Sequence, residues 1–182
     1  MSNNSPCGVA VYCASSSRVP AIYLETATRM GTLLARHGLT LVCGGGYRGL
    51  MGAAIDGAGA AGGKTVGVLP QFMIERGWAH PDLTEVISTP TMHVRKETMA
   101  SMSRAAVALA GGIGTLDELC EIMTWHQLGL FAGPVIIVNT DGFYDPLIEM
   151  FGRMQSQQFM RGGVIPAVVV PTPEEAIDVI LR

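Results

Sequence analysis

Residues 104–127 read RAAVALAGGIGTLDELCEIMTWHQ, and this stretch decides the fold. Its first part is an apolar run that predicts a buried strand, and its last part predicts a long helix. Between them stand Gly111, Gly112 and Gly114. Glycine lacks a Cβ, so this turn can bend sharply and approach a ligand closely. The free N–H groups and the dipole at a helix N-terminus bind anions. The stretch therefore predicts a strand, a glycine turn and a phosphate site.

Apolar runs alternate with segments of helical periodicity along the rest of the chain. The predicted strands are 8–14, 39–43, 64–69, 83–88, 105–110, 134–138 and 167–170. The predicted helices follow Pro20, Gly49, Thr91, Thr115, Tyr144 and Thr172. Residues 71–81 show no clear period and are predicted to form a loop over one end of the sheet. The alternation predicts an α/β fold, a doubly wound, mainly parallel sheet of about 6–7 strands.

Length and composition bound the possible functions. A chain of 182 residues is expected to form a single domain, 1–182, with a full hydrophobic core. Hydrophobic residues make up 48% and charged residues only 15%, so part of the surface is expected to be buried between subunits. The net charge of −3 provides no basic field for nucleic acid or an anionic membrane, so neither is expected as a partner.

The sequence predicts a cytoplasmic protein. No apolar run approaches the roughly 20 residues that span a bilayer, and no basic segment precedes a long apolar one at the N-terminus. Cys7, Cys13, Cys43 and Cys120 form no C-x-x-C pair. The first three lie in or beside predicted strands and are expected to be buried, reduced thiols.

A second glycine motif, Gly44-x-Gly46-x-x-Gly49, follows a predicted strand and opens a helix. It matches the dinucleotide-binding fingerprint, but it follows the second strand, and no acidic residue ends the next strand to bind a ribose. A tight turn with close helix packing is one alternative. Another is that the loop, including Gly45, forms one wall of a mononucleotide pocket.

The segment from Thr115 to Glu118 has two interpretations. Thr-x-x-Glu fits a capping box, in which both side chains satisfy backbone N–H groups. Thr172 and Glu175 repeat the pattern at the last helix, where nothing suggests chemistry. The alternative is a catalytic carboxylate at Glu118, favoured because a simple cap does not require the preceding glycine turn.

Arg95 and Lys96 place two adjacent cations at the head of a predicted helix. Positive charge there opposes the helix dipole, so a nearby anion would stabilise it. The alternative is a pair of solvated surface charges. Met92, Met99 and Met102 on the same helix indicate core packing or, alternatively, a dimer face.

Other catalytic classes lack their motifs. The four histidines show no ligand spacing with cysteines or carboxylates, so no metal site is expected. Ser15–Ser17 follow no nucleophile-elbow pattern and are better interpreted as phosphate or ribose hydrogen-bonding groups. A P-loop is absent from the sequence.

Several stretches together resemble the LONELY GUY (LOG) family: VYCASSS, LVCGGGYRGLMG, MHVRK, AGGIGTLDE, residues 122–129 and NTDGFYDPL. These proteins are cytokinin riboside 5′-monophosphate phosphoribohydrolases, often mislabelled as lysine decarboxylases. The resemblance runs in order from about Val9 to Phe159. The M-x-x-R-K motif and the glycine-rich G-G-x-G-T-x-x-E motif are specific when found together.

The resemblance implies a Rossmann-like fold, a homodimer with sites near the interface, and hydrolysis of the N-glycosidic bond of an adenosine 5′-monophosphate derivative. The family's catalytic residues fall on Arg95 and Glu118. No metal and no organic cofactor are expected. The implied substrate-binding residues are Lys96, Gly111, Gly112, Gly114, Thr115, Thr124 and Glu75, and Ser15 and Gly45 are added as pocket residues.

Two positions depart from the family pattern. Ala110 replaces a proline and Ala14 replaces a glycine, which changes backbone restraint and pocket volume without removing a charge. A non-catalytic carrier of a nucleotide or molybdenum cofactor is the competing function. Pyridoxal phosphate chemistry fits poorly, because it needs a Schiff-base lysine and Lys96 beside Arg95 suits anion binding better.

Overall fold

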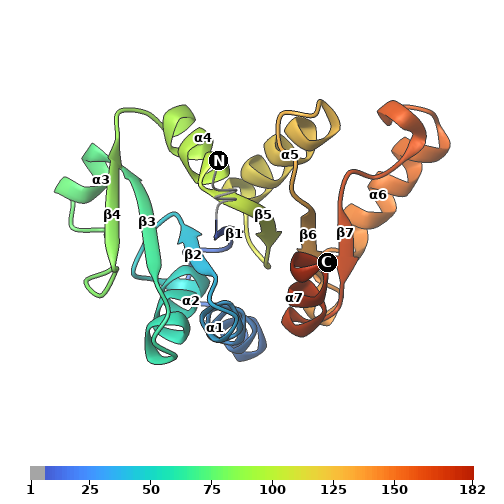
Figure 1. The fold of residues 1–182 in the computed structure, drawn as a ribbon. Helices are drawn as coiled ribbons and strands as arrows, with labels where there is room; N and C mark the ends of the chain where they lie inside the picture. The colour runs from blue at the N-terminus through green and yellow to red at the C-terminus, as the bar shows by residue number, and fades with distance from the viewer. Residues whose placement is uncertain (1–6) are drawn as a thin grey trace.

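One parallel sheet of seven strands forms the centre of the protein, in the order β4-β3-β2-β1-β5-β6-β7 (Figure 1). The computed structural model describes residues 7–182. The strands are β1 Gly8–Tyr12, β2 Thr40–Cys43, β3 Thr65–Pro70, β4 Glu85–Thr89, β5 Ser103–Ala108, β6 Val135–Val138 and β7 Val168–Val170. Every neighbouring pair is parallel. The predicted doubly wound α/β fold is confirmed.

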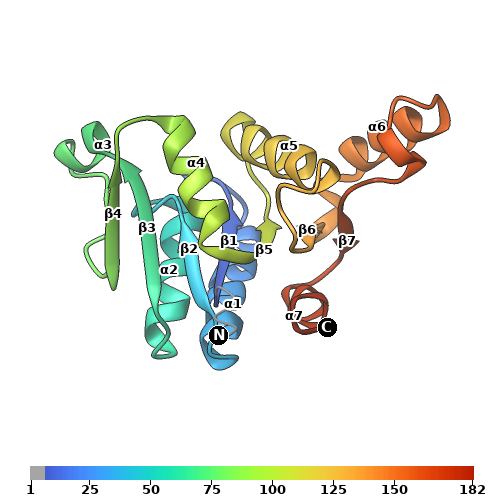
Figure 2. The same cartoon turned by 45° about the horizontal axis from the view of Figure 1, so that its top comes forward.

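Helices cover both faces of this sheet. They are α1 Ala21–Arg36, α2 Gly49–Ala60, α3 Gln71–Glu75, α4 Met92–Ser101, α5 Ile113–Gln127, α6 Asp145–Ser156 and α7 Pro173–Leu181, with 3₁₀ turns η1 Thr140–Gly142 and η2 Arg161–Gly163. Figures 1 and 2 show α1, α2 and α7 on one face and α4, α5 and α6 on the other. Within residues 7–182, no helix combines the length and the apolar character needed to cross a membrane.

The apolar strands supply two core layers. All five residues of β1 are buried, as the continuous apolar run predicts for a strand covered on both faces. Side chains alternate across a strand, so Val9 and Val11 join the layer under α1, α2 and α7. Ala10 and Tyr12 join the layer under α4, α5 and α6.

Small residues bring α1 and α2 into backbone contact. A Cβ on Gly31 would collide with the carbonyl oxygen of Ala54, and a Cβ on Gly57 would collide with that of Thr28. One interpretation of the Gly44-x-Gly46-x-x-Gly49 motif is a tight turn with close packing of the helix that follows it, α2. The structure shows this close packing against the neighbouring helix α1.

Three local predictions are corrected. Residues 71–75 form the short helix α3, although the segment was expected to be a loop. Helix α5 begins at Ile113 with Gly112 as its N-cap and has no side-chain cap, so Thr115 lies inside the helix. Cys7 is exposed rather than buried, whereas Cys13 and Cys43 are buried as expected, and all four thiols are free.

The order of the strands determines where a ligand can bind. Chain order runs outward from β1 through β2 and β3 on one side, and through β5, β6 and β7 on the other. The loops that leave the carboxyl ends of β1 and β5 therefore diverge and leave a crevice between them. Such a switch point is where open α/β sheets bind ligands.

Candidate active site

A cavity of about 660 Å³ lies at this switch point. Its walls come from the ends of β1, β2 and β3, the N-termini of α2, α4 and α5, and α3 with the loop after it. The cavity is lined by Cys13, Ala14, Ser15, Ser16, Gly44, Gly46, Tyr47, Arg48, Met51, Leu69, Met73, Trp78, Met92, Arg95, Gly112, Gly114, Thr115, Asp117 and Glu118. The two predicted catalytic residues and the glycine turn thus share one cavity.

Arg95 and Glu118 form a buried ion pair at the base of this cavity. Arg95 Nη1 donates to Glu118 Oε1 at 2.9 Å, and Arg95 Nε donates to the carbonyl oxygen of Val68 at 3.0 Å. Only 8% of the Arg95 side chain and 9% of the Glu118 side chain are exposed. The ion pair excludes the capping-box interpretation of Glu118, because its carboxylate binds a guanidinium from another helix.

Burial sets the protonation behaviour of Glu118. Loss of solvent raises the pKa of its carboxyl group above the ordinary value of 4.5, and the opposing attraction of Arg95 only partly offsets this. A carboxylate with a raised pKa in a cavity is typical of a catalytic group. Its position one and a half turns into α5 places it beside the helix N-terminus.

The first glycine of the Gly44-x-Gly46-x-x-Gly49 motif makes room for Arg95. A Cβ on Gly44 would collide with Arg95 Nη2. Gly45 has a positive φ of 69° and packs against Leu69. The motif therefore forms a tight turn that also walls the cavity, which supports the pocket-wall interpretation.

The N-terminus of α5 points free amide groups toward the cavity. The first N–H that bonds within this turn is that of Leu116, to the carbonyl oxygen of Gly112 at 3.0 Å. Helix geometry leaves the preceding N–H groups for an outside acceptor. Thr115 is buried, and its side chain packs where a Cβ on Gly111 would stand. The glycine turn thus fits an anion such as a phosphate.

Lys96 is held by carboxylates of α5 and is not solvated. Its Nζ lies 3.0 Å from Asp117 Oδ2 and 3.1 Å from Glu121 Oε2. Burial lowers the pKa of Lys96, but the two ion pairs outweigh it and the net pKa is raised. The adjacent cations therefore have anionic partners, as the helix-dipole argument predicted, and those partners belong to the protein. The surface-charge alternative is wrong.

Five predicted binding residues do not line this cavity, namely Gly45, Glu75, Lys96, Gly111 and Thr124, and their binding roles stay predictions. Lys96 is bound by carboxylates of α5, as described above, and Gly111 packs against Thr115. Gly45 packs behind the wall, with its carbonyl oxygen bonded to the N–H of His80. Glu75 is exposed on α3 and accepts a hydrogen bond from Gln71. Thr124 is exposed on α5 and donates to the carbonyl oxygen of Cys120. Neither exposed side chain reaches the cavity of its own chain.

Sequence reasoning missed an aromatic and thioether wall. Tyr47 and Trp78 line the cavity with Met51 and Met73, and the Arg48 guanidinium lies 5.0 Å from the centre of the Tyr47 ring. Two signals were available. Tyr47 and Arg48 stand inside the second glycine motif, and Trp78 lies in the segment expected to cover one end of the sheet.

Comparisons with known proteins identify the family of this chain. A family model described as "Possible lysine decarboxylase" matches residues 51–180. The chain is 37% identical over 171 residues to a "Probable cytokinin riboside 5'-monophosphate phosphoribohydrolase LOGL2" of Oryza sativa subsp. japonica, covering 93% of this chain and 70% of the relative. It is 36% identical over 170 residues to the "Cytokinin riboside 5'-monophosphate phosphoribohydrolase LOG" of the same plant, with the same coverage of 93% and 70%.

Solved structures share the fold. The chain superposes on the Moco carrier protein from Chlamydomonas reinhardtii with a TM-score of 0.71 and 26% identity, covering 94% of this chain and 93% of that chain. The region matched by the family model contains both Arg95 and Glu118. By its family model and its sequence relatives, the chain belongs to the LOG family.

Proposed function

We propose that the protein hydrolyses the N-glycosidic bond of adenosine 5′-monophosphate and its N6-substituted derivatives, releasing the free base and ribose 5-phosphate. The observation that carries this proposal is the buried Arg95–Glu118 pair, which shares a cavity with the helix N-terminus of α5. The names of the relatives support the same activity.

The mechanism follows from the charges in the cavity. Backbone amides at Gly112–Thr115 hold the 5′-phosphate, which positions the ribose over Glu118. As the C1′–N9 bond breaks, its electron pair leaves with the base and positive charge develops on the ribose. The Glu118 carboxylate stabilises that charge and accepts a proton from the water that attacks C1′. The departing base takes up a proton from solvent and Glu118 returns its proton to solvent, so the products are the neutral base and ribose 5-phosphate. Arg95 keeps the carboxylate aimed at the reacting carbon.

The proposal also includes a homodimeric assembly and a cytoplasmic location. A homodimer with sites near the interface would bring exposed side chains such as Glu75 and Thr124 toward a neighbouring cavity. Exposed apolar residues on α5 and the segment after it, namely Ile113, Leu128 and Leu130, are consistent with a covered surface. We place the enzyme in the cytoplasm.

A nucleotide or molybdenum-cofactor carrier is the second candidate, because a Moco carrier protein shares the fold. The buried carboxylate favours the enzyme. A pure anion carrier gains nothing from a negative charge beside a phosphate, whereas an oxocarbenium-like transition state requires one.

Decarboxylation through pyridoxal phosphate is disfavoured, because neither lysine of the chain, Lys64 or Lys96, is suited to form a Schiff base in the cavity. A Schiff base requires a neutral amine, whereas ion pairs raise the pKa of Lys96 and keep it protonated. Lys64 is half exposed and pairs with Glu85 on β4, which does not line the cavity.

The direct test is incubation of purified protein with AMP and with N6-isopentenyl-AMP, followed by chromatography for free base. We expect base release from at least one of the two. Binding of nucleotide without any base release would support the carrier instead.

The pH profile of the reaction should show the raised pKa of Glu118. The ionised carboxylate is the active form, so kcat/KM should fall on the acid side at a pH above 4.5. The Asp117→Asn variant should move the acid limb to lower pH, because the negative charge of Asp117 adds to the raised pKa of Glu118, while burial, the larger cause, remains. An acid limb at or below pH 4.5 would contradict the assignment.

The raised pKa of Glu118 also makes the free energy of unfolding depend on pH. The folded protein binds this proton more tightly than the unfolded chain does. The stabilisation by Glu118 is therefore complete below its ordinary pKa of 4.5 and is lost as the pH rises through its folded pKa.

Adding one methyl group to the glycine turn should separate binding from stability. A Cβ on Gly114 meets no protein atom within 4 Å, so Gly114→Ala fills ligand space without a clash. We expect KM to rise about tenfold, while stability stays unchanged or increases by about 0.5–1 kcal/mol. Steady-state kinetics and thermal melting measure the two effects.

Gly59→Ala is the matched control. Gly59 is an exposed helical glycine of α2, and its Cβ also meets nothing within 4 Å. This variant should gain the same stability with an unchanged KM. If Gly114→Ala and Gly59→Ala had the same KM, the proposal that the glycine turn before α5 binds the substrate would be wrong.

A further inference from the structure

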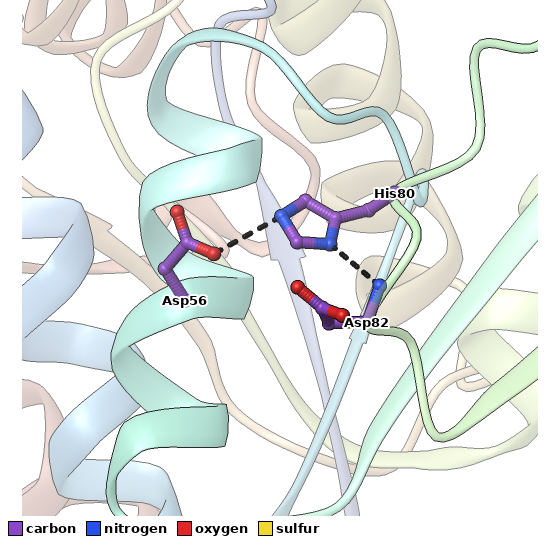
Figure 3. A group of neighbouring side chains, drawn as sticks. All are labelled: Asp56, His80 and Asp82. Atoms are coloured by element: carbon purple, nitrogen blue, oxygen red, sulfur yellow. Dashed lines mark hydrogen bonds and ion pairs between the residues drawn. The ribbon is translucent and has the colours of Figure 1, made fainter.

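Asp56, His80 and Asp82 form a cluster outside the catalytic pair. Their possible ligand atoms lie within 4.8 Å of one another. Figure 3 shows Asp56 projecting from α2 toward the ring of His80, with Asp82 beside the ring. His80 is only 7% exposed, whereas both aspartates are exposed. This cluster was not predicted from the sequence, because the three residues are not at metal-ligand spacing.

The hydrogen bonds of His80 disfavour a metal. Its Nδ1 accepts from the backbone N–H of Asp82 at 3.2 Å. The proton of the neutral ring therefore sits on Nε2, which lies 3.1 Å from Asp56 Oδ1 and donates to it. Both ring nitrogens are engaged, so neither has a lone pair directed toward an ion. The cluster works as a clasp between α2 and the loop after α3.

This clasp holds the segment that carries Trp78. The N–H of His80 donates to the carbonyl oxygen of Gly45 at 2.8 Å, and the N–H of Tyr47 donates to that of Trp78 at 3.3 Å. Gly46 and Ala79 form an isolated antiparallel bridge. Two loops from separate strands are thus joined side by side, and each presents an aromatic ring to the cavity.

The aromatic rings of Tyr47 and Trp78 line the same cavity as the charged side chains of α5. Trp78 is 42% exposed although its backbone is bonded on both sides. The Arg76 guanidinium lies 5.3 Å from the centre of its ring. An exposed aromatic face in a cavity that also contains the N-terminus of α5 suits the planar base of a nucleotide.

We propose that Trp78 binds the base of the nucleotide and that Asp56 and His80 are positioning residues that hold Trp78 in place. The inference rests on the proposed function for the identity of the ligand. Asp56 acts at a distance: it fixes the His80 ring, the ring fixes the loop, and the loop fixes the indole.

The test compares a ligand that has a base with one that lacks it. AMP and ribose 5-phosphate share the phosphate and sugar, so the ratio of their affinities isolates binding of the base. Calorimetric titration in the Glu118→Gln background prevents turnover. Trp78→Ala should weaken AMP binding about tenfold or more, and ribose 5-phosphate binding should stay within about twofold.

Asp56→Ala should weaken AMP binding in the same selective way, by about fivefold, because one hydrogen bond to the ring is lost. Asp56→Asn and Trp78→Phe are the matched controls. Asparagine still offers an oxygen to His80 Nε2, and phenylalanine still offers an aromatic face, so both should restore most of the AMP preference.

The possible results are distinct from those of the hydrolysis test. An unchanged AMP preference in Asp56→Ala or Trp78→Ala overturns the proposal, even if the wild-type protein releases base. Equal weakening of both ligands also overturns it, since that is the result of a general loss of structure. Titration with Zn²⁺ should show no binding at this cluster. If Zn²⁺ bound and Asp56→Ala abolished that binding, the interpretation of the cluster as a structural contact between α2 and the loop after α3 would be wrong.

Discussion

Glu118→Gln is expected to reduce the release of free base by about a thousandfold. Glutamine keeps the shape of the side chain, and its carbonyl oxygen can still accept from Arg95, which now lies 2.9 Å from the carboxylate. The negative charge that stabilises the developing ribose cation is lost. Chromatographic measurement of free adenine under saturating AMP gives the change in kcat.

Two controls identify the cause of that loss. The variant should remain folded by circular dichroism and should still bind AMP, because the amides of α5 are unaltered. Asp117→Asn removes a neighbouring charge that is 57% exposed and should retain activity within about tenfold. If Glu118→Gln kept activity within that same range, the catalytic assignment would be wrong.

Arg95→Met is expected to lower the free energy of unfolding by about 3–5 kcal/mol, because it leaves Glu118 as an unpaired buried charge. Replacing both partners, as Arg95→Met with Glu118→Leu, should recover most of that loss while activity stays absent. Urea denaturation at neutral pH gives the free energy of unfolding of the wild type, of each single variant and of the double variant, which together form a double-mutant cycle.

The pH dependence of the single variant provides an independent check. Without Arg95, the pKa of Glu118 should rise further, since burial already raises it in the pair. The stability of Arg95→Met should therefore recover as the pH is lowered and Glu118 becomes protonated. The two single variants predict a free energy of unfolding for the double variant if their effects simply add. A double variant with a lower free energy of unfolding than this sum would contradict this account of the pair.

Much of the fold followed from local patterns. Continuous apolar runs predicted parallel strands covered on both faces, and β1 is buried throughout. Adjacency along the chain also placed Glu118 beside the glycine turn. The resemblance to the LOG family selected Arg95 as its partner, and the structure brings the two into contact.

Identical local patterns had different outcomes where tertiary contacts intervened. Thr172 caps α7 by accepting from the N–H of Glu175, as its Thr-x-x-Glu pattern predicts. The same pattern at Thr115 does not cap α5, because that helix starts earlier and Glu118 is bound by Arg95. A sequence pattern alone does not show which partner a carboxylate will find.

The sequence by itself determined the alternation of strands and helices, the glycine turn and the acid near it, because these depend on residues close together in the chain. Only the tertiary structure decided that Gly44 makes room for Arg95 and that His80 clasps Asp56 to support Trp78. Those contacts depend on the order of the strands, which brings the loops after β2 and β3 together. Their geometry is a property of the packed sheet, and no local periodicity encodes it.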